Sequence, residues 1–197
     1  MVRLLAGGVL VPLVALVVLG LTASAYVRAD SRQDSRADLA ARSIFRVVLG
    51  SDVELEKKRT PQGALLVVFF HNDDPKRARQ LADSFAARKA GEPQPVKSLP
   101  LVIELTTDPT FAGYAERVPA AVFVAQDVDG RTLKKIVEFG VARHVITYSP
   151  FEGHVESGVL AGLFVDAQVK PFLNRRTLAA GGVTLSPALM QYSRLYE

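Results

Sequence analysis

The chain has 197 residues, 49% of them hydrophobic, and its 24 basic and 20 acidic side chains give a formal net charge of +4. This composition predicts one ordinary globular core and argues against a disordered chain. The absence of cysteine excludes a disulfide framework, a thiol nucleophile and thiolate-bound metal centres. The charge excess is small and dispersed, so we expect no nucleic-acid partner.

The first 25 residues have the pattern of a secretory signal peptide. Arg3 precedes an uncharged apolar run over residues 4–21, and the Ala-Ser-Ala sequence that ends at Ala25 is a typical cleavage site. We expect cleavage there, which leaves a polar leader over residues 26–36. An uncleaved membrane anchor is the alternative, because the run is close to the lower length for a bilayer span. In both cases the remaining chain is expected in the periplasm.

Residues 37–197 are expected to form one domain of alternating helices and strands. Helices are indicated by apolar side chains at helical spacing, and buried strands by continuous apolar runs such as ALLVVFF. Such a series predicts a parallel sheet covered by helices on both faces, which is an α/β three-layer sandwich. In chain order we expect a helix over 37–49, a strand over 64–70, a helix over 75–89, strands over 99–105 and 120–125, a helix over 127–140 and a strand over 141–148.

After Ser149 the pattern changes to that of an antiparallel hairpin. Asp166 and Ala167 separate two apolar runs, which is typical of a tight turn between paired strands. The predicted fold is therefore a mainly parallel sheet with a C-terminal antiparallel hairpin. The expected elements are strands over 158–165 and 168–173, a short helix capped by Asn174, and a final helix that begins at Pro187 and includes Leu195.

Polar side chains follow two of the predicted strands, and ligands of open parallel sheets bind beyond the carboxyl ends of the strands. If the two loops meet, their side chains could coordinate a metal ion or bind a cationic solute. The alternative is that these groups cap helices or are solvated, and we favour it because no two histidines have a metal-ligand spacing. We therefore predict neither a metal nor a cofactor. The candidate ligand-loop residues are His71, Asp73, Glu152, His154, Glu156 and Ser157.

No catalytic motif is present. Ser157 lies three residues after His154, but the G-x-S-x-G pattern of a nucleophile elbow is absent. The glycine-rich patterns of phosphate-binding and dinucleotide-binding loops are absent as well. We therefore predict a protein without catalytic residues.

Four segments of the C-terminal third, taken in order, resemble the YfiR/HmsC-like family of exported bacterial signalling regulators. They correspond to a strand and loop, a glycine-containing strand, the second strand of a hairpin that closes on asparagine, and a short helix with a glycine turn before the last helix. The resemblance is detailed over residues 144–195 and covers most of the expected mature chain in layout. The segments are HVITYS at 144–149, ESGVLAGL at 156–163, VKPFLN at 169–174 and AAGGVTLSPALM at 179–190.

This resemblance implies a non-enzymatic periplasmic regulator. Such a protein would bind the extracytoplasmic part of an inner-membrane diguanylate cyclase and restrain it in cyclic-di-GMP signalling, and we also consider a homodimer. Binding would use an exposed apolar patch, although each candidate residue could instead be ordinary core. The candidates are Val159, Leu163, Phe164, Phe172, Tyr192 and Tyr196.

A periplasmic small-solute-binding protein is the alternative function. Its pocket would lie at the carboxyl ends of the sheet strands and would be formed by the two candidate ligand loops.

Overall fold

The computed structural model describes residues 36–87 and 94–197. The chain divides into two compact units, Met1–Leu39 and Ala40–Glu197. The predicted signal peptide and all but the last residue of the predicted leader lie outside the described residues. Within the described ranges, none of the helices combines the length and the apolar character that a membrane span requires. The following description concerns the second unit.

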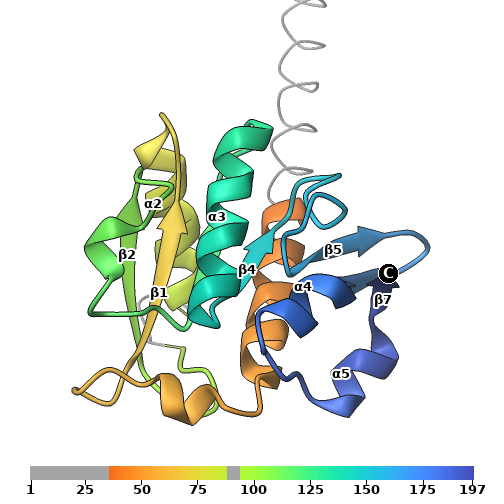
Figure 1. Ribbon diagram of the computed structural model, residues 1–197, viewed down its shortest axis with the longest axis horizontal. Coiled ribbons are helices and arrows are strands. Elements are labelled where there is room, and N and C mark those ends of the chain that lie inside the picture. The colour runs from red at the N-terminus through yellow and green to blue at the C-terminus, as the bar shows by residue number, and fades with distance from the viewer. Residues whose placement is uncertain (1–35, 88–93) are drawn as a thin grey trace, which may run out of the picture. The chain divides into compact units, whose positions relative to one another are not determined.

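The second unit is built on one seven-stranded sheet in the order β2-β1-β3-β4-β5-β6-β7 (Figure 1). Neighbouring strands are parallel from β2 to β5, β5 and β6 form an antiparallel hairpin, and β7 is parallel to β6. The predicted α/β fold with a mainly parallel sheet and a C-terminal hairpin is therefore confirmed. The strands are β1 Leu65–Phe70, β2 Leu101–Thr106, β3 Ala121–Val124, β4 Ile146–Ser149, β5 Ala161–Val165, β6 Val169–Asn174 and β7 Arg194–Tyr196.

The helices begin where the sequence places capping residues. The carboxylate of Asp74 accepts a hydrogen bond from the backbone of Arg77, and a proline occupies the first helical position. The side chain of Asn174 accepts one from the backbone of Thr177 at 2.9 Å, as the predicted cap requires. The elements are a helix through 40–51, η1 Leu55–Lys58, α2 Pro75–Ala86, η2 Ala112–Tyr114, α3 Gly130–Arg143, α4 Arg175–Ala180 and α5 Pro187–Tyr192.

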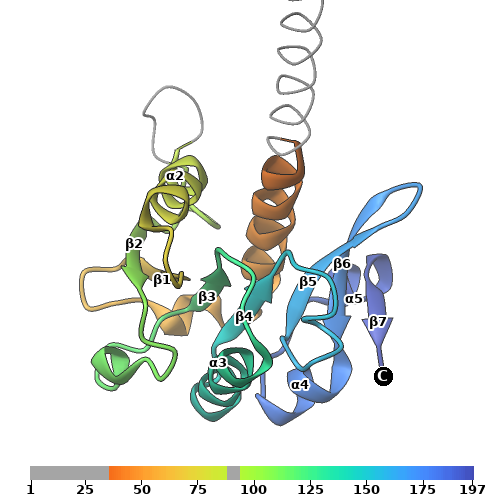
Figure 2. The same cartoon turned by 90° about the horizontal axis from the view of Figure 1, so that it is seen from above.

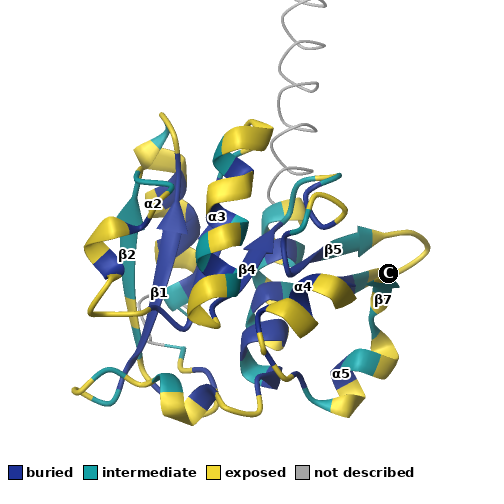
Figure 3. Cartoon of the chain, viewed as in Figure 1, coloured by how far each residue is buried: buried dark blue, intermediate teal, exposed yellow. Residues whose placement is uncertain are grey.

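Helices cover both faces of the sheet. The helix through 40–51 and α2 lie on one side of the central strands, and α3 lies on the other (Figure 2). Alternate residues of β1 pack into two clusters, one containing Phe45 and Phe85, the other containing Ile136. All six residues of β1 are buried, and Figure 3 shows this strand as one of the most completely covered parts of the molecule. A strand buried on both faces needs apolar side chains at every position, which explains its unbroken run.

Several predicted boundaries are wrong: α2 ends at Ala86 and not at residue 89, β5 begins at Ala161 and not at residue 158, and the boundary between α3 and β4 is displaced. Gly140 does not end α3, which continues to Arg143, so the strand predicted from residue 141 begins only at Ile146. The glycine instead lets α3 approach β4, because a Cβ at this position would lie 2.5 Å from Cγ2 of Thr147. The helix ends at His144, whose φ of 57° is left-handed.

The end of the chain also differs from the prediction. Leu195 is not part of the last helix, since α5 ends at Tyr192 and the chain then adds the short strand β7 to the sheet. Leu195 pairs with Leu173 of β6 and packs against the main core cluster. A strand of three residues is too short to show a periodic sequence pattern, so the sequence alone does not indicate this long-range pairing.

Candidate functional site

The first place to seek a ligand is the reversal of strand order between β1 and β3, where open α/β sheets usually bind one. Gln126 occupies it. Its Oε1 accepts hydrogen bonds from the backbone nitrogens of Asn72 (2.7 Å), Asp73 (3.1 Å) and Asp74 (3.2 Å), and its Nε2 donates to Oδ1 of Asp73 at 2.8 Å. These amides could otherwise bind an anion, so the side chain of Gln126 closes the crevice.

The two candidate ligand loops do not form a metal centre. Throughout residues 36–87 and 94–197, no group of three or more histidine or carboxylate side chains is arranged to hold a metal ion. His71 is buried, and its Nδ1 has no hydrogen-bond partner in the part of the chain that is described. Asp73 is bound by Gln126. The part of the chain that is described therefore gives no support to the less favoured possibility, a cluster of His71 and Asp73 with the loop after β4.

That loop, residues 150–158, is fastened by a chain of three side chains. His154 places Nδ1 2.7 Å from Oγ of Ser149 and Nε2 3.0 Å from Oδ1 of Asp127. Because the carboxylate can only accept, Nε2 carries the proton and Nδ1 accepts the hydroxyl proton of Ser149. The Ser149 oxygen also accepts from the backbone nitrogen of Phe151 at 3.3 Å. Sequence analysis singled out His154 but not its two partners.

The three residue types are those of a serine hydrolase, but their burial is reversed. A nucleophilic serine must reach its substrate, and the acid that orients the histidine is normally buried. Here the exposed fraction of Ser149 is 0%, whereas the side chain of Asp127 is 75% exposed. The arrangement therefore holds the loop in place and does not present a nucleophile. Ser157, the serine that lies three residues after His154, takes no part in it.

Burial lowers the pKa of the His154 imidazole, and the nearby carboxylates of Asp127 and Glu156 oppose this effect. The neutral ring that burial favours is consistent with an Nδ1 that accepts the hydroxyl proton of Ser149. Two further bonds hold the loop from the other side. Asn174 donates to the carbonyl of Val155 at 2.7 Å. Thr177 donates to the carbonyl of Gly158 at 2.8 Å. The loop is therefore preorganised.

Between this loop and the β5–β6 hairpin lies a cavity of about 350 Å³, which we call the acidic pocket. It combines two carboxylates, Glu152 and Glu156, with aromatic rings, of which Phe164 and Phe172 lie 5.8 Å apart at a 63° angle. It lies beyond the carboxyl end of β4. The lining residues are Pro150, Phe151, Glu152, Gly153, Val155, Glu156, Leu163, Phe164, Val165 and Phe172.

The candidate surface residues divide into three groups. Val159 is fully buried, so its assignment to an exposed patch is wrong; it lies under the loop, where its backbone nitrogen donates to the carbonyl of His154. Phe172 is also buried, and part of it lines the acidic pocket. Leu163 and Phe164 line the same pocket and are half-buried. Tyr192 and Tyr196 are exposed.

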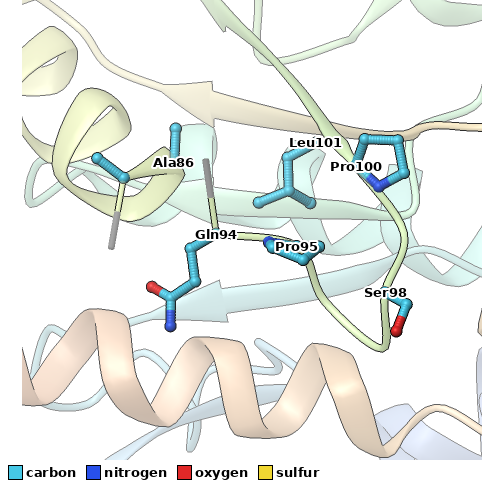
Figure 4. A pocket seen from close by; sticks show the side chains of 7 residues that line it. Ala86, Gln94, Pro95, Ser98, Pro100 and Leu101 are labelled. Carbon is cyan, nitrogen blue, oxygen red and sulfur yellow. The ribbon is translucent and has the colours of Figure 1, made fainter. Parts of the chain in front are cut away.

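A larger cavity of about 510 Å³ lies beside the end of α2 (Figure 4). Its described lining includes no ionisable side chain, and the chain next to it, residues 88–93, lies outside the described residues. Nothing in its lining selects a class of ligand. The lining residues are Ala86, Ala87, Gln94, Pro95, Ser98, Pro100 and Leu101.

No family model matches the chain, and no curated protein matches it either. Among solved structures, it is similar to an ABC domain in complex with L-Trp from Streptococcus pneumoniae, with a TM-score of 0.50 and 13% identity over 75% of this chain and 62% of that one. It is also similar to the ligand-free, open structure of a substrate-binding protein with adhesive properties from Clostridium difficile, with a TM-score of 0.50 and 12% identity over 74% of this chain and 58% of that one. The chain spans less than two thirds of either neighbour's length, and at this identity the likeness concerns the fold.

Proposed function

We propose that this protein is an extracytoplasmic binding domain that captures a small organic cation in the acidic pocket. The observation that carries the proposal is the joint presence of two carboxylates and several aromatic rings around one preorganised cavity. Its volume of about 350 Å³ lies within the usual range for small-molecule sites. The pocket also lies beyond the carboxyl end of a sheet strand, where ligands of this fold class bind.

The charge of the lining determines the class of solute. Glu152 and Glu156 are its two ionisable residues, so within the described lining no lysine or arginine neutralises them. An ammonium group can pair with these carboxylates while its alkyl part contacts the faces of Phe164 and Phe172. Anionic solutes would be repelled. The fold likeness to a substrate-binding protein and to a domain in complex with L-Trp also supports a binding role.

Thermal unfolding in the presence of choline or putrescine tests the proposal, with acetate as the anionic control. A cation at about 100 times its Kd adds about 2.7 kcal/mol to the unfolding free energy, which raises the Tm by about 5–10 °C for a domain of this size. The double variant Glu152→Gln with Glu156→Gln should lose this rise. The matched control, Glu116→Gln with Glu138→Gln, removes two exposed carboxylates outside the pocket and should keep it.

Two outcomes would refute the solute-binding proposal. One is that neither cation shifts the Tm of the unmodified protein. The other is a shift that survives the double substitution in the pocket, because the cation would then bind elsewhere.

The regulator that the YfiR/HmsC-like resemblance implies is our second candidate, since Tyr192 and Tyr196 of its proposed surface are exposed. In this function the protein would bind and restrain an inner-membrane diguanylate cyclase. Deleting the gene should then raise cellular cyclic-di-GMP, and the double variant Tyr192→Ser with Tyr196→Ser should fail to restore it. An unchanged level after deletion would refute this candidate.

A further inference from the structure

The last three strands carry two basic side chains, Lys170 and Arg194, that do not line the acidic pocket. Strand register places Phe164 opposite Lys170, and Phe172 opposite Arg194. Because side chains alternate along a strand, these four residues and Tyr196 share one face of the β5–β6–β7 end of the sheet. This face therefore joins aromatic and basic groups.

The two cations of this face are held against aromatic rings. The guanidinium carbon of Arg194 lies 5.0 Å from the ring centre of Phe164, and Nζ of Lys170 lies 5.7 Å from that of Tyr192. Over the described ranges neither cation forms an ion pair with a carboxylate. A guanidinium that lies over a ring keeps its N–H edges free for an in-plane carboxylate.

Both cations line a cavity of about 450 Å³, which we call the basic groove. Asp166 is its one acidic residue, so the ionisable lining is net positive. Phe164 also lines the acidic pocket, so its ring borders both cavities. The lining residues are Phe164, Asp166, Ala167, Gln168, Lys170, Gln191, Tyr192, Ser193 and Arg194.

Two exposed tyrosines lie beside the cations of the basic groove. Tyr192 lines the groove and is 53% exposed, and Tyr196, on the same face as Arg194, is 37% exposed. The exposed loop of the hairpin can be seen at the right of Figure 3. Exposed apolar groups gathered around unpaired cations are typical of surfaces that bind a partner.

The sheet also ends here. β7 is the last strand in the sheet order and lies at the margin of the unit in Figures 1 and 2. An edge strand offers its outer backbone groups to an added extended segment. Every second side chain of such a segment would point to the face that carries Arg194 and Tyr196.

We propose that the basic groove and the edge of β7 dock an extended segment of another protein in which every second side chain faces the groove, and these facing side chains are acidic and apolar in turn. The carboxylates pair with Arg194 and Lys170, and the apolar side chains cover Tyr192 and Tyr196. An anionic membrane is the less suitable occupant, because Asp166 at the hairpin tip would enter the lipid headgroups together with the cations. This proposal goes beyond the solute-binding function and does not require a solute in the acidic pocket.

Fluorescence anisotropy with the full chain and a labelled acetyl-ETFTE-amide peptide, whose two glutamates and phenylalanine share one face of an extended segment, tests this proposal. We expect saturable binding that weakens as salt is added, and a Kd at least tenfold higher for the double variant Lys170→Gln with Arg194→Gln. The control variant Arg131→Gln with Lys135→Gln removes two exposed cations of α3 and should bind like the unmodified protein. Arg194→Lys keeps the charge but loses the paired N–H groups, so its Kd should rise by a smaller factor.

Four results would overturn the proposal. The neutral QTFTQ peptide could bind as tightly as the acidic one, or the α3 control could lose as much affinity as the groove variant. Free N-acetylglutamate could compete at the concentration at which the unlabelled peptide competes, which would make the groove a small-molecule site. Finally, phosphatidylglycerol vesicles could bind the protein while the peptide does not, which would make this face a membrane contact.

Discussion

The link from Ser149 through His154 to Asp127 makes a prediction that depends on burial. If the three side chains hold the loop and do no chemistry, the cost of removing each should follow the buried packing and hydrogen bonds that are lost with it. The order of destabilisation should then be His154→Ala, Ser149→Ala and Asp127→Asn. A catalytic arrangement would show its largest effects on turnover, with no such order in stability.

The magnitudes follow from the contacts. Ser149→Ala leaves the Nδ1 of a buried ring without its donor and the backbone of Phe151 without its acceptor, which costs about 1–3 kcal/mol. Asp127→Asn changes an exposed group that can still accept from Nε2, so we expect at most about 1 kcal/mol. His154→Ala removes both bonds and leaves a cavity, for which about 2–4 kcal/mol is expected.

Urea unfolding followed by circular dichroism measures these differences, provided that the slope of the transition stays the same among the variants. A double-mutant cycle between Ser149 and His154 should give a coupling energy of about 0.5–3 kcal/mol, because the two groups are in direct contact. Two results would refute the reasoning. One is a loss for Asp127→Asn as large as that for Ser149→Ala, and the other is hydrolysis of a p-nitrophenyl ester that disappears in Ser149→Ala.

Three further predictions concern pH and packing. Burial lowers the pKa of His154 below 6.5, so the unfolded chain binds the proton more readily than the folded protein does. The unfolding free energy should therefore fall as pH drops from about 6.5 toward the folded-state pKa. Urea titrations at several pH values measure this dependence, and His154→Gln should remove it. In Gly162→Ala the new Cβ would lie 2.7 Å from a backbone oxygen of β4, which should cost about 1–3 kcal/mol in chemical unfolding, whereas Gly113→Ala has no atom within 4 Å and should be close to neutral. Lys58→Met leaves the carboxylate of Asp52, 2.8 Å from the lost ammonium, charged and buried, so a loss of about 3–5 kcal/mol is expected, and much of it should return when Asp52→Asn is added.

The features that sequence analysis predicted correctly are local. The strand β1 is buried on both faces, and its every residue is apolar, so its type and place follow from one short run. Asp74 and Asn174 cap helices that begin at the next residue, which depends on contacts across three positions. The turn at Asp166 joins the two strands of the predicted hairpin. Each of these signals is complete within a few residues.

The features that it missed join distant parts of the chain. Gln126 bonds to backbone nitrogens more than fifty positions earlier, and nothing in its own neighbourhood indicates such a role. Asp127 meets His154 across 27 positions, and Ser149 meets the same ring only because β4 ends beside the loop. A valine such as Val159 is found both on exposed strands and in protein cores, so its residue type does not predict its burial. It is buried because the fold places the loop over it.

The same distant contacts explain why the binding chemistry lies at the β5–β7 end of the sheet and not at the reversal of strand order. At the reversal, the amide of Gln126 satisfies the backbone groups that a ligand would need. Beyond β4, the β5–β6 hairpin lies beside the loop 150–158, which the hydrogen bonds of His154 hold in place. The acidic pocket forms between the hairpin and this loop. The ring of Phe164 separates this acidic cavity from the basic groove on the other side. The β5–β6 hairpin forms a wall of both cavities. A ligand that orders the hairpin by binding in the acidic pocket should therefore also change the conformational freedom of the basic groove.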